Sequence, residues 1–230
     1  MKIRLLVALA VAGVAAVVAA GSAGAAQDST CPDGILASGI YNNVSVTGSC
    51  TATGEVLIKG NLTVNGNSVF DAGQGGTIFG NVQAWNGSVL ILESFEIHGV
   101  SASAAKSVIL EEDTLGSALI QGGGGAPLGA CSRHDVPVTG DPIVDVAFNE
   151  ALGTVSIGGR GGCANSIFDN TISGGVNFVN NQADPTDGNS VDPNTISGNL
   201  FCKNNSPHPS GAGTNSVWGT INFPGDCNAP

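Results

Sequence analysis

The chain has 230 residues, with seven Lys or Arg against 18 Asp or Glu, so its formal net charge is −11 at pH 7. Such a surface repels nucleic acid and anionic lipid, because it offers too few cations to displace the counterions of a phosphate backbone. The composition therefore excludes a nucleic-acid-binding protein and suits solubility, cations or neutral partners.

The first 26 residues have the features of a secretory signal peptide. Lys2 and Arg4 form a basic region, residues 5–20 are apolar, and residues 23–25 read Ala-Gly-Ala, a small-residue cleavage pattern. A membrane anchor is the alternative, but the apolar run is shorter than the roughly 20 residues that a spanning helix needs. We therefore predict a secreted, extracellular protein that is not inserted in a membrane. Loss of two basic residues with the signal gives the mature chain a net charge of −13.

The mature chain, residues 27–230, contains a repeat with a period near 20 residues. A period of this length is typical of a solenoid, in which each repeat forms one turn. Two shorter versions read "EIHGVSA" (96–102) and "TLGSALI" (114–120). The full copies, aligned on their glycines, are "LIKGNLTV" (57–64), "TIFGNVQA" (77–84), "TISGGVNF" (171–178), "TISGNLFC" (195–202) and "SVWGTINF" (216–223).

Within each copy, apolar and polar residues alternate with period two, which is the pattern of a β-strand. A second strand in each turn is expected to begin at the pairs Ser68-Val69, Ser88-Val89 and Ser107-Val108. A leucine-rich repeat would require leucines at fixed offsets and a helical side, and the 35 glycines indicate turns instead. The sequence therefore predicts an all-β, single-domain, right-handed parallel β-helix of about eight coils.

Equivalent residues of neighbouring copies are expected to lie directly above one another. Apolar residues would bury against their counterparts, asparagines would form a ladder of hydrogen bonds, and glycines would occupy corners where a Cβ clashes. The predicted pairs are Leu62 with Val82, Ile172 with Ile196, Val176 with Leu200, Asn170 with Asn194 and Gly174 with Gly198.

The repeat is interrupted by an irregular insertion near residues 121–153. The 58 residues from Gly116 to Gly174 leave room for about three coils, yet the motif is not visible between them. Either degenerate coils are hidden there or a loop protrudes from the rod.

All six cysteines lie in the mature chain, and an even number in an exported protein indicates disulfides rather than metal binding or catalysis. Six cysteines allow 15 connectivities. Proximity in the sequence favours the pairs Cys31–Cys50, Cys131–Cys163 and Cys202–Cys227.

The mature chain resembles the small secreted, Gly/Asn/Val-rich, right-handed β-helix proteins of actinobacteria. The resemblance rests on strings such as "GNLFC" (198–202) and "NNSPHP" (204–209), followed by a terminal Cys227. It covers most of residues 31–230 and implies a fold and a compartment rather than an activity.

One acidic segment could bind calcium. Asp184, Asp187, Asn189 and Asp192 surround Gly188, and clustered carboxylate and amide oxygens near a glycine turn are suitable ligands for Ca²⁺. The spacing differs from that of an EF-hand. The alternative, which we prefer, is a polar turn inserted between two coils. No other cofactor is predicted.

No residues form an evident catalytic centre. The weak candidates are His134 and Arg133, in the string "CSRHD" (131–135), together with Arg160. Adjacent residues point in different directions, whereas a catalytic triad converges from distant positions. A polysaccharide lyase would also need cations to neutralise its substrate, and the few basic residues of the mature chain are scattered. Catalysis rests on analogy with other β-helix enzymes alone.

Outward-pointing aromatic residues suggest a binding surface. Exposed aromatic rings beside amides can stack on sugar rings, although isolated exposed aromatics are common. An ice-binding face would need regular rows of threonine, and these positions are mixed. The candidate binding residues are Phe79, Trp85, Phe201 and Trp218.

Two functional hypotheses follow from the sequence. The first is a secreted structural or binding protein of the cell envelope or extracellular space, whose partner is a cell-wall or extracellular polysaccharide. The second is a small polysaccharide lyase or glycoside hydrolase. We prefer the first, because the repeat accounts for nearly every conspicuous residue.

Overall fold

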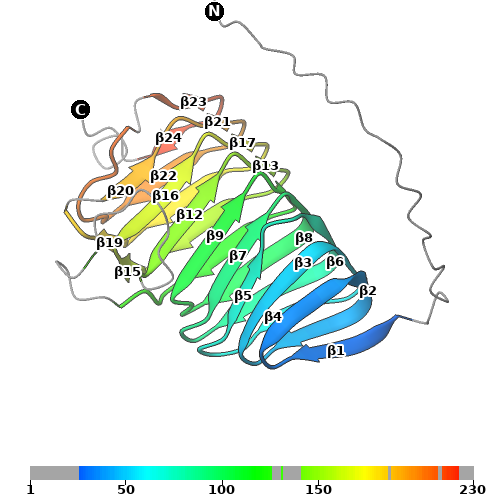
Figure 1. Ribbon diagram of the computed structural model, residues 1–230. Coiled ribbons are helices and arrows are strands. Elements are labelled where there is room, and N and C mark those ends of the chain that lie inside the picture. The colour runs from blue at the N-terminus through cyan, green and yellow to red at the C-terminus, as the bar shows by residue number, and fades with distance from the viewer. Residues whose placement is uncertain (1–25, 126–130, 132–140, 186–187, 212–213, 223–230) are drawn as a thin grey trace, which may run out of the picture.

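The computed structural model describes residues 26–125, 131, 141–185, 188–211 and 214–222. Twenty-two parallel strands in one sheet wind into a rod of about nine turns, which confirms the predicted β-helix and adds one turn to the predicted number (Figure 1). The chain advances along the rod from β1 at one end to β23 and β24 at the other (Figure 1). Among the described residues, no helix is long and apolar enough to cross a membrane. The predicted signal peptide lies outside them.

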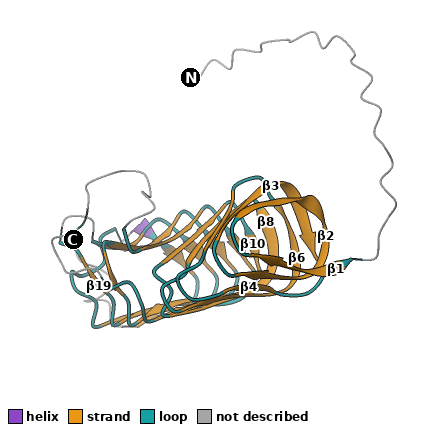
Figure 2. Cartoon of the chain, turned by 60° about the horizontal axis from the view of Figure 1, so that its bottom comes forward, coloured by secondary structure: helices purple, strands orange, loops and turns teal. Residues whose placement is uncertain are grey.

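A complete turn contributes strands to three faces of the rod, with loops at the corners (Figure 2). Face 1 contains β1 (Gln27–Cys31), β4 (Leu62–Val64), β11 (Ala118–Gln121), β14 (Val155–Gly158), β18 (Val176–Val179), β22 (Leu200–Lys203) and β24 (Ile221–Asn222). Face 2 contains β10 (Thr114–Leu115), β13 (Glu150–Ala151), β17 (Thr171–Ile172), β21 (Thr195–Ile196) and β23 (Ser216–Val217). Face 3 contains β5 (Val69–Ala72), β7 (Val89–Glu93), β9 (Ser107–Glu111), β12 (Ile143–Ala147), β16 (Ala164–Phe168) and β20 (Asn189–Val191).

Four longer strands in the N-terminal half continue around the corners and so belong to more than one face. They are β2 (Gly34–Val46), β3 (Ser49–Ile58), β6 (Gly76–Trp85) and β8 (Phe95–Ser103). A separate two-stranded sheet joins β15 (Gly161–Gly162) to β19 (Gln182–Ala183).

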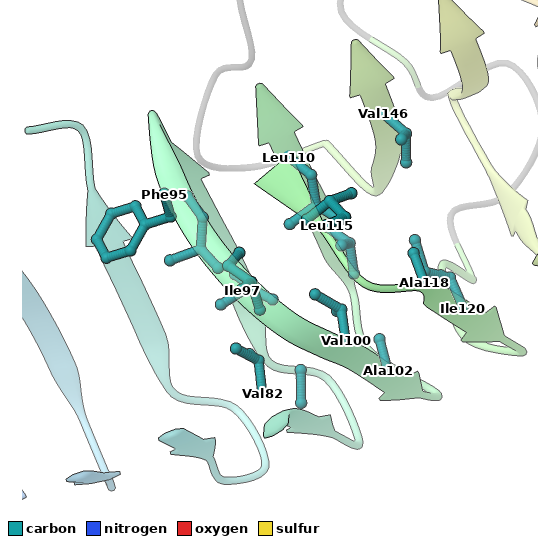
Figure 3. Close-up of a cluster of buried hydrophobic side chains, with 14 of the residues drawn as sticks. Val82, Phe95, Ile97, Val100, Ala102, Leu110, Leu115, Ala118, Ile120 and Val146 are labelled. Atoms are coloured by element: carbon teal, nitrogen blue, oxygen red, sulfur yellow. The ribbon is translucent and has the colours of Figure 1, made fainter. Parts of the chain in front are cut away.

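The interior consists of rows of apolar side chains stacked in register. Every predicted pair of inward residues is confirmed: Leu62 lies opposite Val82, Ile172 opposite Ile196, and Val176 opposite Leu200. Figure 3 shows such side chains meeting between the strands in the middle of the rod. Because strand neighbours are about 4.8 Å apart, each side chain packs on the ones above and below, and nine turns make a rod about 40 Å long.

The corner glycines occupy positions where the backbones of successive coils come close. A Cβ on Gly174 would lie 2.4 Å from the carbonyl group of Gly153, and one on Gly198 would lie 2.5 Å from the carbonyl oxygen of Gly174. No Cβ tolerates such a contact, so the predicted clash is confirmed. Gly153 is thereby identified as a further corner glycine of the stack.

Part of the predicted irregular segment is regular. Strands β12 and β13 pair in register with β9 and β10, and Gly153 stacks on Gly116. Residues 141–153 therefore belong to a degenerate coil, so the irregular part is shorter than the sequence indicated. Residues 126–130 and 132–140 lie outside the described part of the chain.

Two predicted disulfides are confirmed. Cys31 is bonded to Cys50 near the N-terminal end of the rod, and Cys131 is bonded to Cys163. Cys202 is buried in the core and is also disulfide-bonded. Its predicted partner, Cys227, lies outside the described residues.

A ladder of asparagines satisfies the backbone at the corner between faces 3 and 2. The backbone N–H and the Nδ2 of Asn170 both donate to Oδ1 of Asn194, at 3.0 and 2.9 Å. Asn149 donates in the same way to Asn170, and Asn194 to Asn215. Each Nδ2 also donates to a backbone carbonyl of the preceding coil, such as Val146 for Asn170. The predicted asparagine ladder is confirmed and is longer than expected.

Asp113 occupies the first position of this ladder. Its Oδ1 accepts a 2.7 Å hydrogen bond from the N–H of Phe95, and its own N–H donates to Oδ1 of Asn149. Its Oδ2 takes the place of an asparagine Nδ2 but is buried without a partner. In the asparagines of the ladder the corresponding atom is a donor, and a carboxyl group can act as a donor here only when it is protonated.

The environment of Asp113 favours that protonated form. Burial raises its pKa from 3.8 to about 8, and the negative charges of Glu111, Glu93 and Glu112 act in the same direction, while the hydrogen bond from Phe95 opposes them. The folded protein therefore holds this proton more tightly than the unfolded chain does, and Asp113 is largely neutral at pH 7.

The protonation of Asp113 predicts a pH-dependent stability. Because its folded pKa is raised, the free energy of unfolding falls as the pH rises from about 4 to about 8. Asp113→Asn supplies the donor permanently, so it should stabilise the protein at about pH 9 by roughly 1–3 kcal/mol. Thermal unfolding of both proteins between about pH 5 and pH 9 measures this.

The pH dependence should shrink in the Asn variant without vanishing, because Glu111 and Asp145 also have raised pKa values. Asp71→Asn, a change on face 3 away from the ladder, is the control and should not reproduce the stabilisation that Asp113→Asn gives at about pH 9. Equal pH dependence in wild type and Asp113→Asn would contradict the neutral carboxyl.

Candidate functional site

A shallow groove runs across the outer surface of face 2 and its corner with face 3. It consists of two adjoining hollows of about 470 and 200 Å³. Thr77, Glu96 and Thr114 line both hollows, so the two form one continuous depression. This depression, built from several coils, is our candidate site.

The floor of the groove follows from the alternation of residues in the strands of face 2. Ile78, Ile97 and Leu115 point inward and are buried. The residue before each of them must therefore point outward. In register, these outward residues form a row that we call the outer row: Thr77, Glu96, Thr114, Glu150, Thr171, Thr195 and Ser216.

The two sides of the groove differ in chemistry. The side toward face 3 is polar and carries Glu55, Gln74, Ser94 and Glu112. The side toward face 1 carries Phe79, His98 and Leu152, and Phe79 and Leu152 are more than half exposed. The groove extends over five successive coils, from the one containing Glu55 to the one containing Leu152, a length of about 19 Å at the strand spacing.

The groove is negatively charged. Three carboxylates line it, from Glu55, Glu96 and Glu112, and no Lys or Arg is among its lining residues. The hydroxyl of Ser94 donates to the carboxylate of Glu112 at 3.4 Å. At the neighbouring corner the pKa of Glu111 is raised, first by burial and then by the charges of Asp145, Glu93 and Glu112.

The four aromatic residues predicted to bind are not gathered in one place. Phe79 is 61% exposed and lies in the groove. Trp218, 76% exposed, occupies the equivalent position in the last described coil, six turns or about 29 Å along the rod. Trp85 and Phe201 lie in two separate outward rows of face 1. Only Phe79 belongs to the candidate site.

The residues predicted to bind calcium have other contacts. Asn189 points into the core, where its side chain donates to Pro207 and accepts from Asn165. Asp192 accepts a hydrogen bond from Thr214, and Asp184 is buried. Asp187 lies outside the described residues. In the described part of the chain, no three His, Cys, Asp or Glu side chains are grouped to hold a metal ion.

Of the catalytic candidates, Arg160 is inside the rod. It is 1% exposed, and its guanidinium donates to the backbone carbonyls of Ala105, Gly122 and Lys106 at 2.6, 2.5 and 3.0 Å. Burial lowers its pKa to about 10, so it remains charged at pH 7. His134 and Arg133 lie outside the described residues.

Arg160 has a structural role instead. It precedes Asn181 and Asn205 in a second, shorter ladder, in which each backbone N–H donates to the next asparagine Oδ1. Gly123 leaves room for the guanidinium, because a Cβ there would lie 2.8 Å from Nη1. The cation thus ties its own coil to two preceding coils through their carbonyl groups.

Most residues of the groove were not among the candidates taken from the sequence. Glu96, Thr77 and Thr114 are the first letters of three repeat copies, so the alignment already placed them in one outward row. Glu55, Gln74 and Glu112 lie at a corner outside the motif, and no sequence signal links them. An exposed edge-to-face pair, Phe148 and Phe168 with ring centroids 5.5 Å apart, was also missed, and Phe148 follows Glu112 in register at the same corner.

Comparisons with known proteins return no match: no family model fits the chain, and neither a curated protein nor a solved structure shows significant similarity.

The buried position of Arg160 predicts a large effect of its removal. Arg160→Ala leaves three carbonyl acceptors without donors and empties a core volume, so the free energy of unfolding should fall by about 3 kcal/mol or more. Urea denaturation measures this loss. Lys59→Ala, at an exposed cation, is the control and should change stability by less than about 0.5 kcal/mol. A similar small change for both variants would contradict the structural role of Arg160.

Proposed function

We propose that the protein is an extracellular binding protein whose groove on face 2 holds an extended polysaccharide chain. The observation that carries the proposal is the combination of an exposed aromatic ring, outward hydroxyls and carboxylates along one straight depression. Aromatic rings stack on the apolar faces of sugars, while hydroxyl and carboxylate groups bind sugar hydroxyls.

The geometry of the groove suits a linear polymer better than a compact ligand. It is open along its length, about 19 Å, and its outer row repeats at the strand spacing of about 4.8 Å. A regular row of polar groups on a rigid backbone matches a regular chain of sugar rings and requires little reordering on binding. The groove is too open to enclose a small molecule, because a typical small-molecule site buries most of its ligand.

The disulfides support the proposed location. Disulfides persist in oxidising compartments, and here they tie the N-terminal coil and the region of Cys163 to their neighbours. Together with the signal-like N-terminal sequence, they favour a role at the cell envelope or outside the cell. The likeness to small secreted actinobacterial β-helix proteins is part of this proposal.

A lyase or hydrolase is the weaker alternative. A lyase acting on acidic polysaccharides needs cations at its site, and the groove lining contains glutamates without Lys or Arg. Arg160, the described catalytic candidate, is buried among backbone carbonyls. We therefore propose binding without turnover.

The aromatic residue of the groove provides the test of this function. Phe79→Ala should weaken binding of the polysaccharide, identified first on a glycan array and by pull-down on isolated cell wall, by about tenfold, because a stacking surface is lost. Isothermal titration calorimetry measures the affinity. Trp218→Ala removes another exposed aromatic from the same position six turns away and is the matched control, with less than a twofold effect expected.

Two results would overturn the proposed site. If Trp218→Ala weakened binding as much as Phe79→Ala, the ligand would lie elsewhere on the rod. If no polysaccharide bound at all, the protein would be a bare scaffold.

A further inference from the structure

We propose that the polysaccharide bound in the groove carries free amino groups, as a glucosamine polymer does, rather than being neutral or acidic. This inference rests on the proposed function and adds the ligand's charge. It follows from the groove's shape, its one-sided charge and the positions of its carboxylates along the rod.

No Lys or Arg offsets the negative charge of the groove, whose one basic lining residue is His98. Glu55, Glu96 and Glu112 face the same depression, and the lining contains no Lys or Arg. Further negative charge from Glu93 and Glu111 lies at the adjoining corner. These carboxylates would repel a uronic acid polymer. A neutral polymer would leave the repulsion among the carboxylates unchanged, whereas an ammonium group would relieve it.

The carboxylates are spread along the rod rather than gathered at one point. Glu55 and Glu112 lie on the same side of the groove, three turns or about 14 Å apart along the rod, and Glu96 lies in the floor at a turn between theirs. The carboxylates are therefore placed to meet several amines of one chain and are not arranged as ligands of a single metal ion. This agrees with the absence of a metal-binding group among the described side chains.

Each contact is weak alone, which makes a polymer the expected ligand. An ion pair at an exposed site changes an affinity by about fivefold at most. The effects of several such pairs on the affinity multiply, because the first contact raises the effective concentration of the next amine on the same chain. A single glucosamine should therefore bind poorly and an oligomer well.

The remaining lining distinguishes a sugar from a cationic peptide. Phe79 offers a flat apolar surface for a ring, and the hydroxyls of Thr77 and Thr114 lie on either side of Glu96 in the outer row. This alternation of hydroxyl and carboxylate along a straight row suits a chain of rings that carry both hydroxyl and amino groups.

The test compares three hexamers that differ in charge: glucosamine, N-acetylglucosamine and glucose. Calorimetry at mildly acidic pH keeps the sugar amines protonated. We expect the glucosamine hexamer to bind about tenfold or more tightly than the other two, with an affinity that falls as salt is added. The triple variant Glu55→Gln, Glu96→Gln, Glu112→Gln should lose this preference while still binding the neutral hexamers.

A matched control separates the groove from the general charge of the protein. Asp71→Asn removes one negative charge on face 3, so it should leave the preference for the glucosamine hexamer unchanged. A loss of preference in Asp71→Asn equal to that in the single variant Glu96→Gln would overturn the inference, because net charge alone would then explain the binding.

Three other outcomes would also contradict the inference. Equal or tighter binding of the neutral hexamers would overturn this inference and leave the proposed polysaccharide function standing. Binding of hexalysine as tight as that of the glucosamine hexamer would overturn it in favour of a cationic peptide. Absence of binding by every hexamer would contradict the proposed function as well.

Discussion

The structure depends on one constraint: equivalent residues of successive coils lie directly above one another at the spacing of parallel strands. Inward, this stacking buries rows of Val, Ile and Leu that no single coil could bury alone. At the corners, it brings backbones so close that Gly174 and Gly198 admit no side chain. Outward, it places residues from distant parts of the sequence in straight rows, and the groove is one result.

The same constraint governs the buried polar groups. A polar side chain inside the rod must find its partners in the coils above and below, as Asn170 does with Asn194. Asp113 and Arg160 each stand at the first position of a ladder, where the preceding coil offers no asparagine. Asp113 supplies the missing donor by retaining a proton. Arg160 satisfies its guanidinium by donating to backbone carbonyls of earlier coils. These two ionisable residues inside the rod thus have structural roles.

The sequence was sufficient to predict the parts of the fold that repeat. The alternation in "TISGGVNF" and "TISGNLFC" predicted the inward pairs correctly, because every coil must meet the same packing requirement. It was insufficient where a coil departs from the motif. In one coil the motif Thr-Ile-Ser-Gly is replaced by Glu150-Ala151-Leu152-Gly153, and this coil was not recognised from the sequence. Ser107 stacks on Val89 rather than on Ser88, since one turn is shorter by a residue. The groove could not be predicted, because Glu55, Gln74 and Glu112 come together only through the corner geometry of several coils.

The central claim is that a straight outward row on face 2 forms the ligand-binding surface, and mapping the bound ligand by NMR tests it most directly. Addition of the glucosamine hexamer to isotope-labelled protein should shift the backbone amide signals of Thr77, Phe79, Glu96 and Thr114. The signals of the corresponding outward residues Thr171 and Thr195, in the C-terminal half of the same row, should stay in place. Shifts concentrated on face 1 or face 3, with the signals around Glu96 unmoved, would contradict the account.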